Sequence, residues 1–341
     1  MNPRTAAVVS ALAVAAVLGW LVPWASVRPL VSLFAGAKRT VRNYRGEDVP
    51  LGLGGVWMVW AVCVAAAVAG APLVSAALPD STQRAAAALA YAAGLLLPAG
   101  VAVVAVAGMA DDLFGSEKDR GLGGHLRAVS EGSVTTGLLK LAVIALMSAW
   151  ATAPLLVGGT DVLWAARPGV VAWAAGAVLV AGTTNLVNLL DLRPGRALKV
   201  SGTLVVLALP ALAFSLPPLR GALSPAGWEV AAVVGALALG PMLACLPADL
   251  RERSMLGDAG ANAAGFVTGL VLAHALSELT LVTAAAAVVA LNLMSERLSF
   301  SAVIDRSPLL HDLDMIGRRP LPPEPPAHDD ADSDDDCWWH E

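Results

Sequence analysis

Nine long apolar runs dominate this 341-residue sequence and limit what it can fold into. Apolar residues make up 57% of the chain and charged residues only 14%, which is unlike a soluble globular domain. A run of about 17 to 25 apolar residues can cross a bilayer as a helix. We therefore predict an all-α polytopic membrane bundle of about nine transmembrane helices. The runs lie at 6–27, 55–78, 85–109, 134–156, 168–189, 200–217, 227–246, 261–277 and 279–295.

The runs favour helices because they are continuous, whereas the strands of a membrane barrel alternate apolar and polar residues over about ten positions. The first run is similar to a signal peptide. Only one charge, Arg4, precedes it and many further runs follow, so we expect it to be retained. The sequence thus predicts one integral membrane domain over residues 1–320.

The basic residues predict the orientation of this domain. Connections after odd-numbered runs hold 16 lysines and arginines, whereas those on the other side hold 4. Basic loops stay in the cytoplasm, so we expect the amino terminus outside and the carboxyl terminus in the cytoplasm. Residues 321–341 form a proline-rich and acidic segment, with seven acids from 328 onward, and we expect a disordered cytoplasmic tail.

Carboxylates gather on the predicted cytoplasmic side. Asp111 and Asp112 follow the third run, Asp191 follows the fifth, and Asp258 precedes the eighth. Two adjacent carboxylates repel each other unless a cation or basic group offsets their charge. The residues Asp111, Asp112 and Asp258 thus indicate either a site for a cation and its phosphates, or solvated helix ends and a helix N-cap.

Two further features of the sequence have similar alternatives. Asn185, Asn188 and Asp191 are three residues apart, so on a helix they share a face about 120° wide. They either bind a nucleotide and metal, or cap the helix and bond to a neighbouring span. Lys140 lies seven residues into the fourth run. It either snorkels outward or faces inward to meet Asp111, Asp112 or a substrate phosphate.

Four segments, taken in order, resemble the polyprenyl-phosphate N-acetylhexosamine-1-phosphate transferase family. This family includes phospho-N-acetylmuramoyl-pentapeptide transferase and the undecaprenyl-phosphate GlcNAc-1-phosphate transferases. The resemblance covers roughly residues 37–320. The segments are NYRGEDVPLGLGG, MADDLFG, NLVNLLDLRPG and MLGDAGANAAG.

The resemblance implies an enzyme that starts the synthesis of a cell-envelope glycopolymer at the plasma membrane, with its active face in the cytoplasm. It would use Mg²⁺, or Mn²⁺, to transfer a sugar phosphate from a UDP-N-acetylhexosamine to a polyprenyl phosphate. No nucleic acid partner is expected, and a homodimer or a complex with other envelope-synthesis proteins is compatible with the family.

The resemblance also implies roles for residues. Asp111, Asp112 and Asp191 are the expected catalytic acids, and Asp258 and Asp111 the expected metal ligands. Candidate substrate-binding residues are Asn43, Lys140, Asn185, Asn188, Arg251 and His311. Arg251 is a candidate for holding pyrophosphate.

The sequence departs from the family in its third motif, which usually continues as Asp-Gly-x-Asp-Gly. Here Leu192 replaces the first glycine and Pro194 the second acid. The fifth connection keeps only His311 where muramoyl-pentapeptide enzymes have consecutive histidines, which argues against that substrate. A catalytically silent scaffold or regulator is therefore an alternative. A secondary transporter is less favoured because the acids crowd one face instead of the midplane.

Overall fold

The computed structural model describes residues 3–75, 80–115, 130, 133, 135–157, 169–215 and 227–320, and it is mostly helical. The predicted tail, residues 321–341, lies outside the described residues. The elements are α1 (Pro3–Ala16), η1 (Val17–Leu21), α2 (Val22–Gly36), β1 (Thr40–Arg42), β2 (Asp48–Pro50), α3 (Leu53–Ser75), α4 (Asp80–Leu96), α5 (Pro98–Phe114), α7 (Thr136–Ala151), α8 (Pro154–Val157), α9 (Val170–Leu190), α10 (Arg196–Ser215), α11 (Gly227–Leu250), α12 (Gly257–Ala275), α13 (Glu278–Ser295), α14 (Phe300–Arg306) and α15 (Pro308–Met315).

Among the described residues, seven helical segments are long and apolar enough to cross a membrane. These are Thr5–Gly36, Leu53–Gly70, Ala85–Phe114, Val170–Leu190, Arg196–Ser215, Gly227–Leu250 and Glu278–Ser295. The other two predicted runs are also helical. However, α7 has only 16 residues, and α12 carries polar residues such as Asp258 and Asn262. The helical membrane character is thus supported, whereas the count of nine and the orientation stay predictions.

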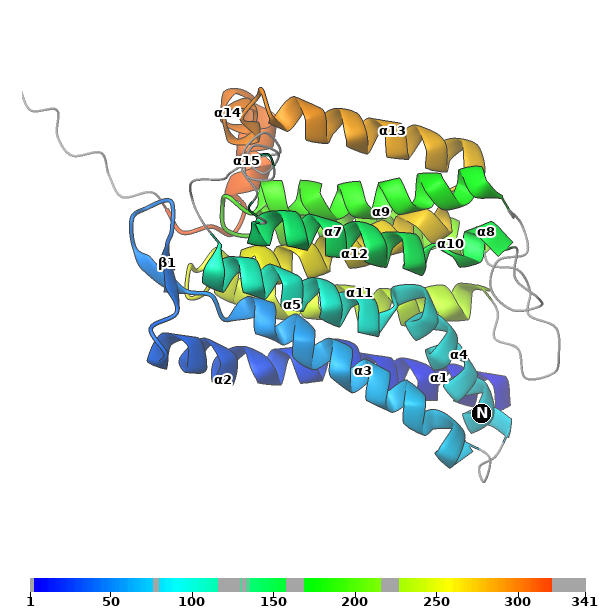
Figure 1. The fold of residues 1–341 in the computed structure, drawn as a ribbon. Coiled ribbons are helices and arrows are strands. Elements are labelled where there is room, and N and C mark those ends of the chain that lie inside the picture. Colours follow the sequence, from blue (N-terminus) through cyan, green and yellow to red (C-terminus); the bar gives the residue numbers. More distant parts are fainter. Residues whose placement is uncertain are drawn as a thin grey trace, which may run out of the picture.

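The third apolar run was predicted to be one helix. In the structure it is divided at Leu97 into α4 and α5. This residue has a left-handed backbone with φ of 43°. The next residue, Pro98, disfavours helical geometry at the residue before it and starts α5 as its first residue. As a result α4 and α5 run in different directions (Figure 1).

The long helices lie side by side, with the polar connections at one end of the bundle. Figure 1 shows the hairpin of β1 and β2 at the same end as α14 and α15, whereas α1 begins at the opposite end. At this end a hydrogen bond also joins the hairpin to the connection between α11 and α12, because the Met255 N–H donates to the carbonyl of Pro50. The described chain therefore starts and finishes at opposite ends of the bundle, whichever end faces the cytoplasm.

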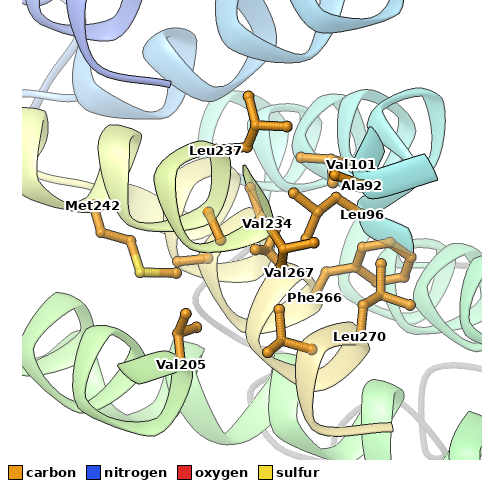
Figure 2. Close-up of a cluster of buried hydrophobic side chains, with 14 of the residues drawn as sticks. Ala92, Leu96, Val101, Val205, Val234, Leu237, Met242, Phe266, Val267 and Leu270 are labelled. Carbon is orange, nitrogen blue, oxygen red and sulfur yellow. The ribbon is translucent and has the colours of Figure 1, made fainter. Parts of the chain in front are cut away.

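Helix α12 lies at the centre of the bundle and is buried along nearly its whole length. In Figure 2 its residues Phe266, Val267 and Leu270 lie among side chains from α4, α5, α10 and α11, including Leu96 and Leu237. Lipid is as apolar as these side chains, so close packing rather than water exclusion holds such a core together.

Glycines allow α12 to approach its neighbours closely. A Cβ added at Gly265 would lie 2.7 Å from the Cα of Thr184 in α9, and one at Gly269 would lie 2.7 Å from the Cα of Val180. On the α5 side, a Cβ at Gly108 would lie 2.5 Å from the carbonyl oxygen of Asp258. Backbone therefore packs directly on backbone at these points, as is common between membrane helices.

The first polar connection contains a small antiparallel hairpin, which the all-α prediction did not include. β1 and β2 pair Thr40 with Pro50 and Arg42 with Asp48. The turn between them is closed by Asn43, whose Oδ1 accepts hydrogen bonds from the N–H groups of Arg45 and Glu47, each 2.9 Å long. This side-chain turn explains why a polar segment between two spans folds back on itself.

The third and fourth connections are shorter than the sequence suggested. α9 continues to Leu190 and α10 begins at Arg196, so only residues 191–195 connect them. In the same way only residues 251–256 separate α11 from α12. Asp191 and Asp258 therefore stand at helix ends, where helical backbone holds them.

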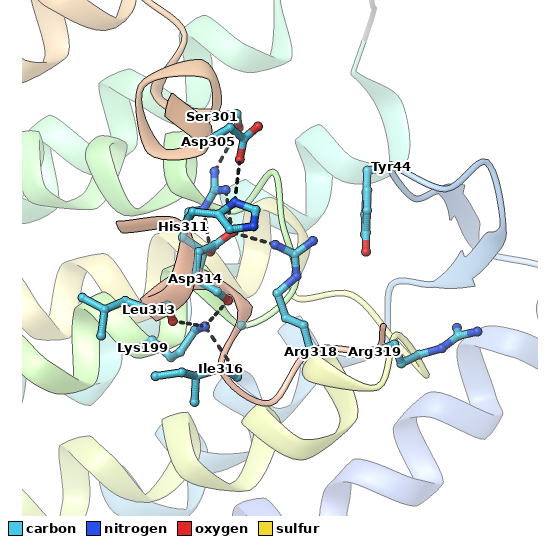
Figure 3. A network of polar contacts seen from close by, with 12 residues as sticks. Tyr44, Lys199, Ser301, Asp305, His311, Leu313, Asp314, Ile316, Arg318 and Arg319 are labelled. Carbon is cyan, nitrogen blue, oxygen red and sulfur yellow. Dashed lines mark hydrogen bonds and ion pairs between the residues drawn. The ribbon is translucent and has the colours of Figure 1, made fainter. Parts of the chain in front are cut away.

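An ion-pair network fastens α15 to the start of α10 (Figure 3). The guanidinium of Arg196 donates two 2.9 Å hydrogen bonds to the carboxylate of Asp314. Arg318 donates a third, 2.6 Å long, to the same carboxylate. Both Arg196 and Asp314 are buried. A two-pronged arginine contact fixes orientation as well as charge, so α15 has one defined rotation about its axis.

This network predicts how stability depends on pH. Burial by itself would raise the pKa of Asp314, but the hydrogen bonds and charge of Arg196 and the charges of Arg318 and Lys199 lower the pKa below its usual value. A carboxyl group with a lowered pKa stabilises the fold above its unfolded-state pKa, and this contribution is lost as the pH falls through its folded-state pKa.

We therefore expect Asp314→Asn to lower the unfolding temperature in detergent by a constant amount from about pH 8 to pH 5, and by less below about pH 4. The matched control is Asp312→Asn, because Asp312 is exposed on the same helix. A difference between wild type and Asp314→Asn that grows on acidification would contradict this account of the network.

Candidate functional site

Two of the predicted acids meet at Lys140. Its ammonium group donates a 2.6 Å hydrogen bond to Oδ2 of Asp111 and another to Oδ2 of Asp258. Thr136 Oγ1 donates to the other carboxylate oxygen of Asp111 at 2.5 Å. Helices α5, α7 and α12 are thereby joined at one end of the bundle. Of the alternatives for Lys140, the inward-facing one is confirmed, since only 8% of the residue is exposed.

Asp112 has a different task from its neighbour. Its two carboxylate oxygens accept hydrogen bonds from the backbone N–H groups of Asp258 at 2.9 Å and Ala259 at 3.1 Å. These groups belong to the first turn of α12, where N–H groups lack partners within the helix. Asp112 thus caps α12 from another helix, and the alternative in which Asp258 itself is the N-cap is wrong, because Asp258 lies within the first turn of α12.

Asp191 stands at the end of α9 beside this group. Burial raises its pKa well above the usual value, and the charges of Asp249, Asp258 and Asp112 raise it further. These acids therefore share one electrostatic neighbourhood, although the hydrogen bonds of Lys140 go to Asp111 and Asp258. Such a concentration of carboxylates requires protonation or a counter-cation, and Lys140 supplies part of the positive charge.

A pocket opens next to Asp191, where the first, third and fourth connections meet. The space inside it that the centre of a water molecule can reach is about 20 Å³, so the pocket as it stands holds about one water molecule. The residues that line it are Asn43, Tyr44, Asp191, Leu192, Arg193, Pro194, Asp249, Glu252 and Met255. Leu192 and Pro194, which depart from the family pattern, thus stand in the pocket wall.

Three guanidinium groups surround the ring of Tyr44, which lines this pocket. Those of Arg45 and Arg318 lie 5.1 Å from the ring centroid and that of Arg193 lies 4.5 Å from it. These distances are within the range of cation–π attraction. Arg45 is also held by Glu252 at 2.9 Å. Of these three arginines only Arg193 lines the pocket, together with the three acids Asp191, Asp249 and Glu252.

Asn43 and Asn185, both predicted to bind substrate, hold parts of the protein together. Asn43 Nδ2 donates to Glu252 at 2.9 Å and links the hairpin to the fourth connection. Asn185 Nδ2 donates to Oδ1 of Asn292 at 2.7 Å, which joins α9 to α13. For Asn185 the alternative of bonding a neighbouring span is confirmed, and a role of either residue toward substrate stays a prediction.

The remaining predicted residues are less closely tied to the acids. Asn188 is half-buried on the same helix as Asn185, and Arg251 is exposed in the fourth connection. His311 Nδ1 lies 3.9 Å from a carboxylate oxygen of Asp305 in the α14–α15 segment (Figure 3). The structure thus brings Lys140 and the acids together, and it leaves the roles of these three residues as predictions.

Sequence reasoning missed several residues around the site. Thr136 gave no signal because a hydroxyl at a helix start is common. Asp249 is buried and accepts a 2.8 Å hydrogen bond from Gly195 N–H. Glu252 gathers Asn43, Tyr44 and Arg45 around one carboxylate. The acid of Pro247-Ala248-Asp249-Leu250, at the end of an apolar run, was a signal that could have been used.

The donor set fits a magnesium ion that shares its ligands with phosphate. Within the described ranges, no three His, Cys, Asp or Glu side chains form a ready metal site. However, the carboxylates of Asp111 and Asp258 converge on one cationic atom. Mg²⁺ is usually held by one or two carboxylates plus substrate phosphates and water. The pair therefore suits an ion that arrives with a phosphate-bearing substrate.

Comparison with the models of known protein families gives no match, and comparison with curated proteins gives none either. The resemblance to the transferase family therefore stays a prediction from the four ordered motifs, two of which meet at Lys140 in the structure.

Proposed function

We propose that this protein transfers an N-acetylhexosamine phosphate from a UDP-sugar to a polyprenyl phosphate in the plasma membrane and releases UMP. The observation that carries the proposal is the meeting of Asp111 and Asp258 at Lys140. These acids come from two motifs far apart in the sequence, and the order of the motifs is that of the transferase family. Asp191, whose pKa is raised in part by the charge of Asp258, lines the pocket around Tyr44.

In the proposed reaction, an oxygen of the lipid phosphate forms a bond to the β phosphorus of the UDP-sugar. The bond between that phosphorus and the bridging oxygen breaks, and UMP leaves with the electron pair. A phosphate monoester is mostly dianionic at neutral pH, so the acids need not remove a proton from it. Bound Mg²⁺ would neutralise the pyrophosphate and stabilise charge on the leaving UMP.

The residues of the chain would supply binding and orientation. Asp111 and Asp258 would hold the ion, and Lys140 would place a positive charge next to the phosphates. Tyr44 and Arg193, which line the pocket, would contact the nucleotide. The polyprenyl chain would remain in the bilayer.

Asp112 would support this site from outside the reacting groups. It would keep the start of α12 in place, because its carboxylate is bonded to two backbone amides there. Asp258 belongs to that same first turn, so the position of its carboxylate depends on the cap.

The test is UMP release by the purified protein with undecaprenyl phosphate, Mg²⁺ and a panel of UDP-N-acetylhexosamines. We expect UMP only when lipid and metal are both present, and only background release from Asp258→Asn. The control Asp312→Asn changes an exposed acid away from the site and should keep full activity. If folded protein releases no UMP with any sugar, the transferase proposal fails.

A specific observation also favours a second candidate, a catalytically silent membrane protein that organises envelope synthesis. Lys140 already neutralises two acids, and both oxygens of Asp112 are occupied by backbone amides. In addition, Pro194 stands in the pocket wall where the family carries an acid. A silent protein would bind UDP-sugar or lipid in a calorimetric titration without turnover, so binding and UMP release measured together separate the two candidates.

A further inference from the structure

Helix α15 and the residue that follows it carry an apolar stripe that faces away from the protein. Leu309 is 70% exposed, Leu313 51% and Ile316 61%. The spacing of these residues, i, i+4 and i+7, places them on one side of the helix. Asp314, on another side, is buried against α10. A helix on the surface of a soluble protein has the reverse arrangement, with its apolar stripe toward the core.

The outward direction of this stripe is fixed by polar contacts. Asp314 is held by Arg196 and Arg318, and the ammonium of Lys199 donates to the backbone carbonyls of Leu313, Asp314 and Ile316. In Figure 3 the side chains of Leu313 and Ile316 point away from this network. Turning the stripe inward would break all these contacts, so the polar contacts of α15 determine that the stripe is exposed.

The stripe continues an apolar surface that belongs to a membrane-crossing helix. Lys199 begins a line of residues along one side of α10, spaced three or four apart, that includes Leu207 at 70% and Phe214 at 91% exposure. α10 is one of the seven helices apolar and long enough to cross a membrane. Because Lys199 bonds to the end of α15, the stripe of α15 lies next to the Lys199 end of this line.

The short connection between α13 and α14 limits how far α14 and α15 can lie from the membrane surface. α13 is another candidate span, with only 11% of its residues buried, and it ends at Ser295. α14 begins five positions later at Phe300, and an extended chain advances at most about 3.5 Å per residue. α14 and α15 therefore stay close to the membrane surface.

The charges near α14 also indicate that this part of the protein lies at a membrane surface. Arg297, which precedes α14, and Arg306, its last residue, are exposed, and Val303 between them is exposed as well. Basic residues next to an apolar helix face attract anionic lipid headgroups.

We propose that α15 lies in the membrane–water interface, with Leu309, Leu313 and Ile316 inserted into the bilayer surface and Arg297 and Arg306 on anionic headgroups. This inference does not depend on the proposed function. It links the bilayer to the pocket, since Arg318 follows the stripe by two residues and stands 5.1 Å from the centroid of Tyr44.

The test uses the full chain in lipid nanodiscs that contain phosphatidylglycerol. Cys63, Cys245 and Cys337 are replaced by alanine, and a nitroxide label is attached to a single cysteine at Leu313 or Ile316. Relaxation by oxygen, which concentrates in the bilayer, is compared with relaxation by a nickel chelate, which stays in water. Leu207→Cys on α10 is the lipid-facing control, and Asp312→Cys on α15 is the water-facing control.

We expect labels at Leu313 and Ile316 to respond to oxygen like the label at Leu207, and to respond to the nickel chelate several-fold less than the label at Asp312. An equal response to the chelate would place the stripe in water and overturn the proposal. Weak responses to both reagents would also overturn it, because they would show a protein surface, such as a second copy of this chain, over the stripe.

A second arm tests the headgroup preference. Replacing phosphatidylglycerol by phosphatidylcholine should increase the nickel response of the Leu313 label, and Arg297→Gln with Arg306→Gln should remove this difference. If lipid charge has no effect in the parent protein, the assignment to anionic headgroups is wrong.

Discussion

Lys140→Met is expected to destabilise the protein strongly, by about 3 to 5 kcal/mol, because it leaves two carboxylates without their counter-ion. The ammonium of Lys140 bonds to both Asp111 and Asp258, and only 10% of its side chain is exposed. Methionine keeps the length and apolar stem of the side chain, so the loss reports on charge. The measurement is the thermal unfolding temperature of the purified protein in detergent.

Removing the acids as well separates the possible causes of this loss. In the Lys140→Met background, Asp111→Asn with Asp258→Asn should recover much of the lost stability, because no buried charge is then unpaired. Lys38→Met serves as the matched control, since Lys38 is exposed beside the hairpin. If the triple variant is no more stable than Lys140→Met, the ammonium contributes through packing and not through charge.

Gly265→Leu is expected to force α12 and α9 apart. Even the Cβ of the new side chain would lie 2.7 Å from the Cα of Thr184, which is backbone and cannot turn aside. Overpacking of a core typically costs about 1 to 3 kcal/mol and sometimes more, and here the whole leucine side chain has no space. We expect poor recovery of folded protein and an unfolding temperature well below that of wild type.

The matched control is Gly70→Leu, because no atom lies within 4 Å of a Cβ added at Gly70 in the membrane-crossing helix α3. Both variants add the same side chain to a helix, so the difference between them isolates the helix contact. Equal stability of the two variants would mean that α9 and α12 are not as close as the structure has them.

The apolar runs of the sequence predicted the helices well, because a long apolar segment in a bilayer can satisfy its backbone only as a helix. Their interruptions were harder to predict. Pro98 was placed inside one run, although α4 ends just before it and α5 starts with it. The hairpin was missed because the side chain of Asn43 closes its turn, and a single asparagine is a weak signal in a polar connection.

The candidate site was predictable in its members but less so in its contacts. Asp111, Lys140 and Asp258 were selected from the sequence and lie together, and an inward-facing lysine was one of two alternatives. The capping of α12 by Asp112 was not foreseen, because Asp112 and the amide that it caps at Asp258 are 146 positions apart in the chain. No local pattern can indicate a bond between residues that only the folded chain brings together.

Glu252 was missed for the same reason. Its carboxylate accepts a hydrogen bond from Asn43, which lies 209 positions earlier in the chain. In the sequence it stands between Arg251 and Arg253 in a polar connection, where an acid is typical of a solvated loop. Its burial depends on the hairpin, and the hairpin itself was not predicted.

The burial of α12 has a consequence for how the protein is made. A segment enters the bilayer from the translocon according to its own apolarity, and α12 is not among the seven helices that are apolar enough. Its polar residues Asn262 and Thr268 are buried by neighbouring helices in the finished bundle. The helices that pack most closely on α12 are α5, α9 and α10, which all precede it in the chain, so α12 is expected to insert against them and not alone.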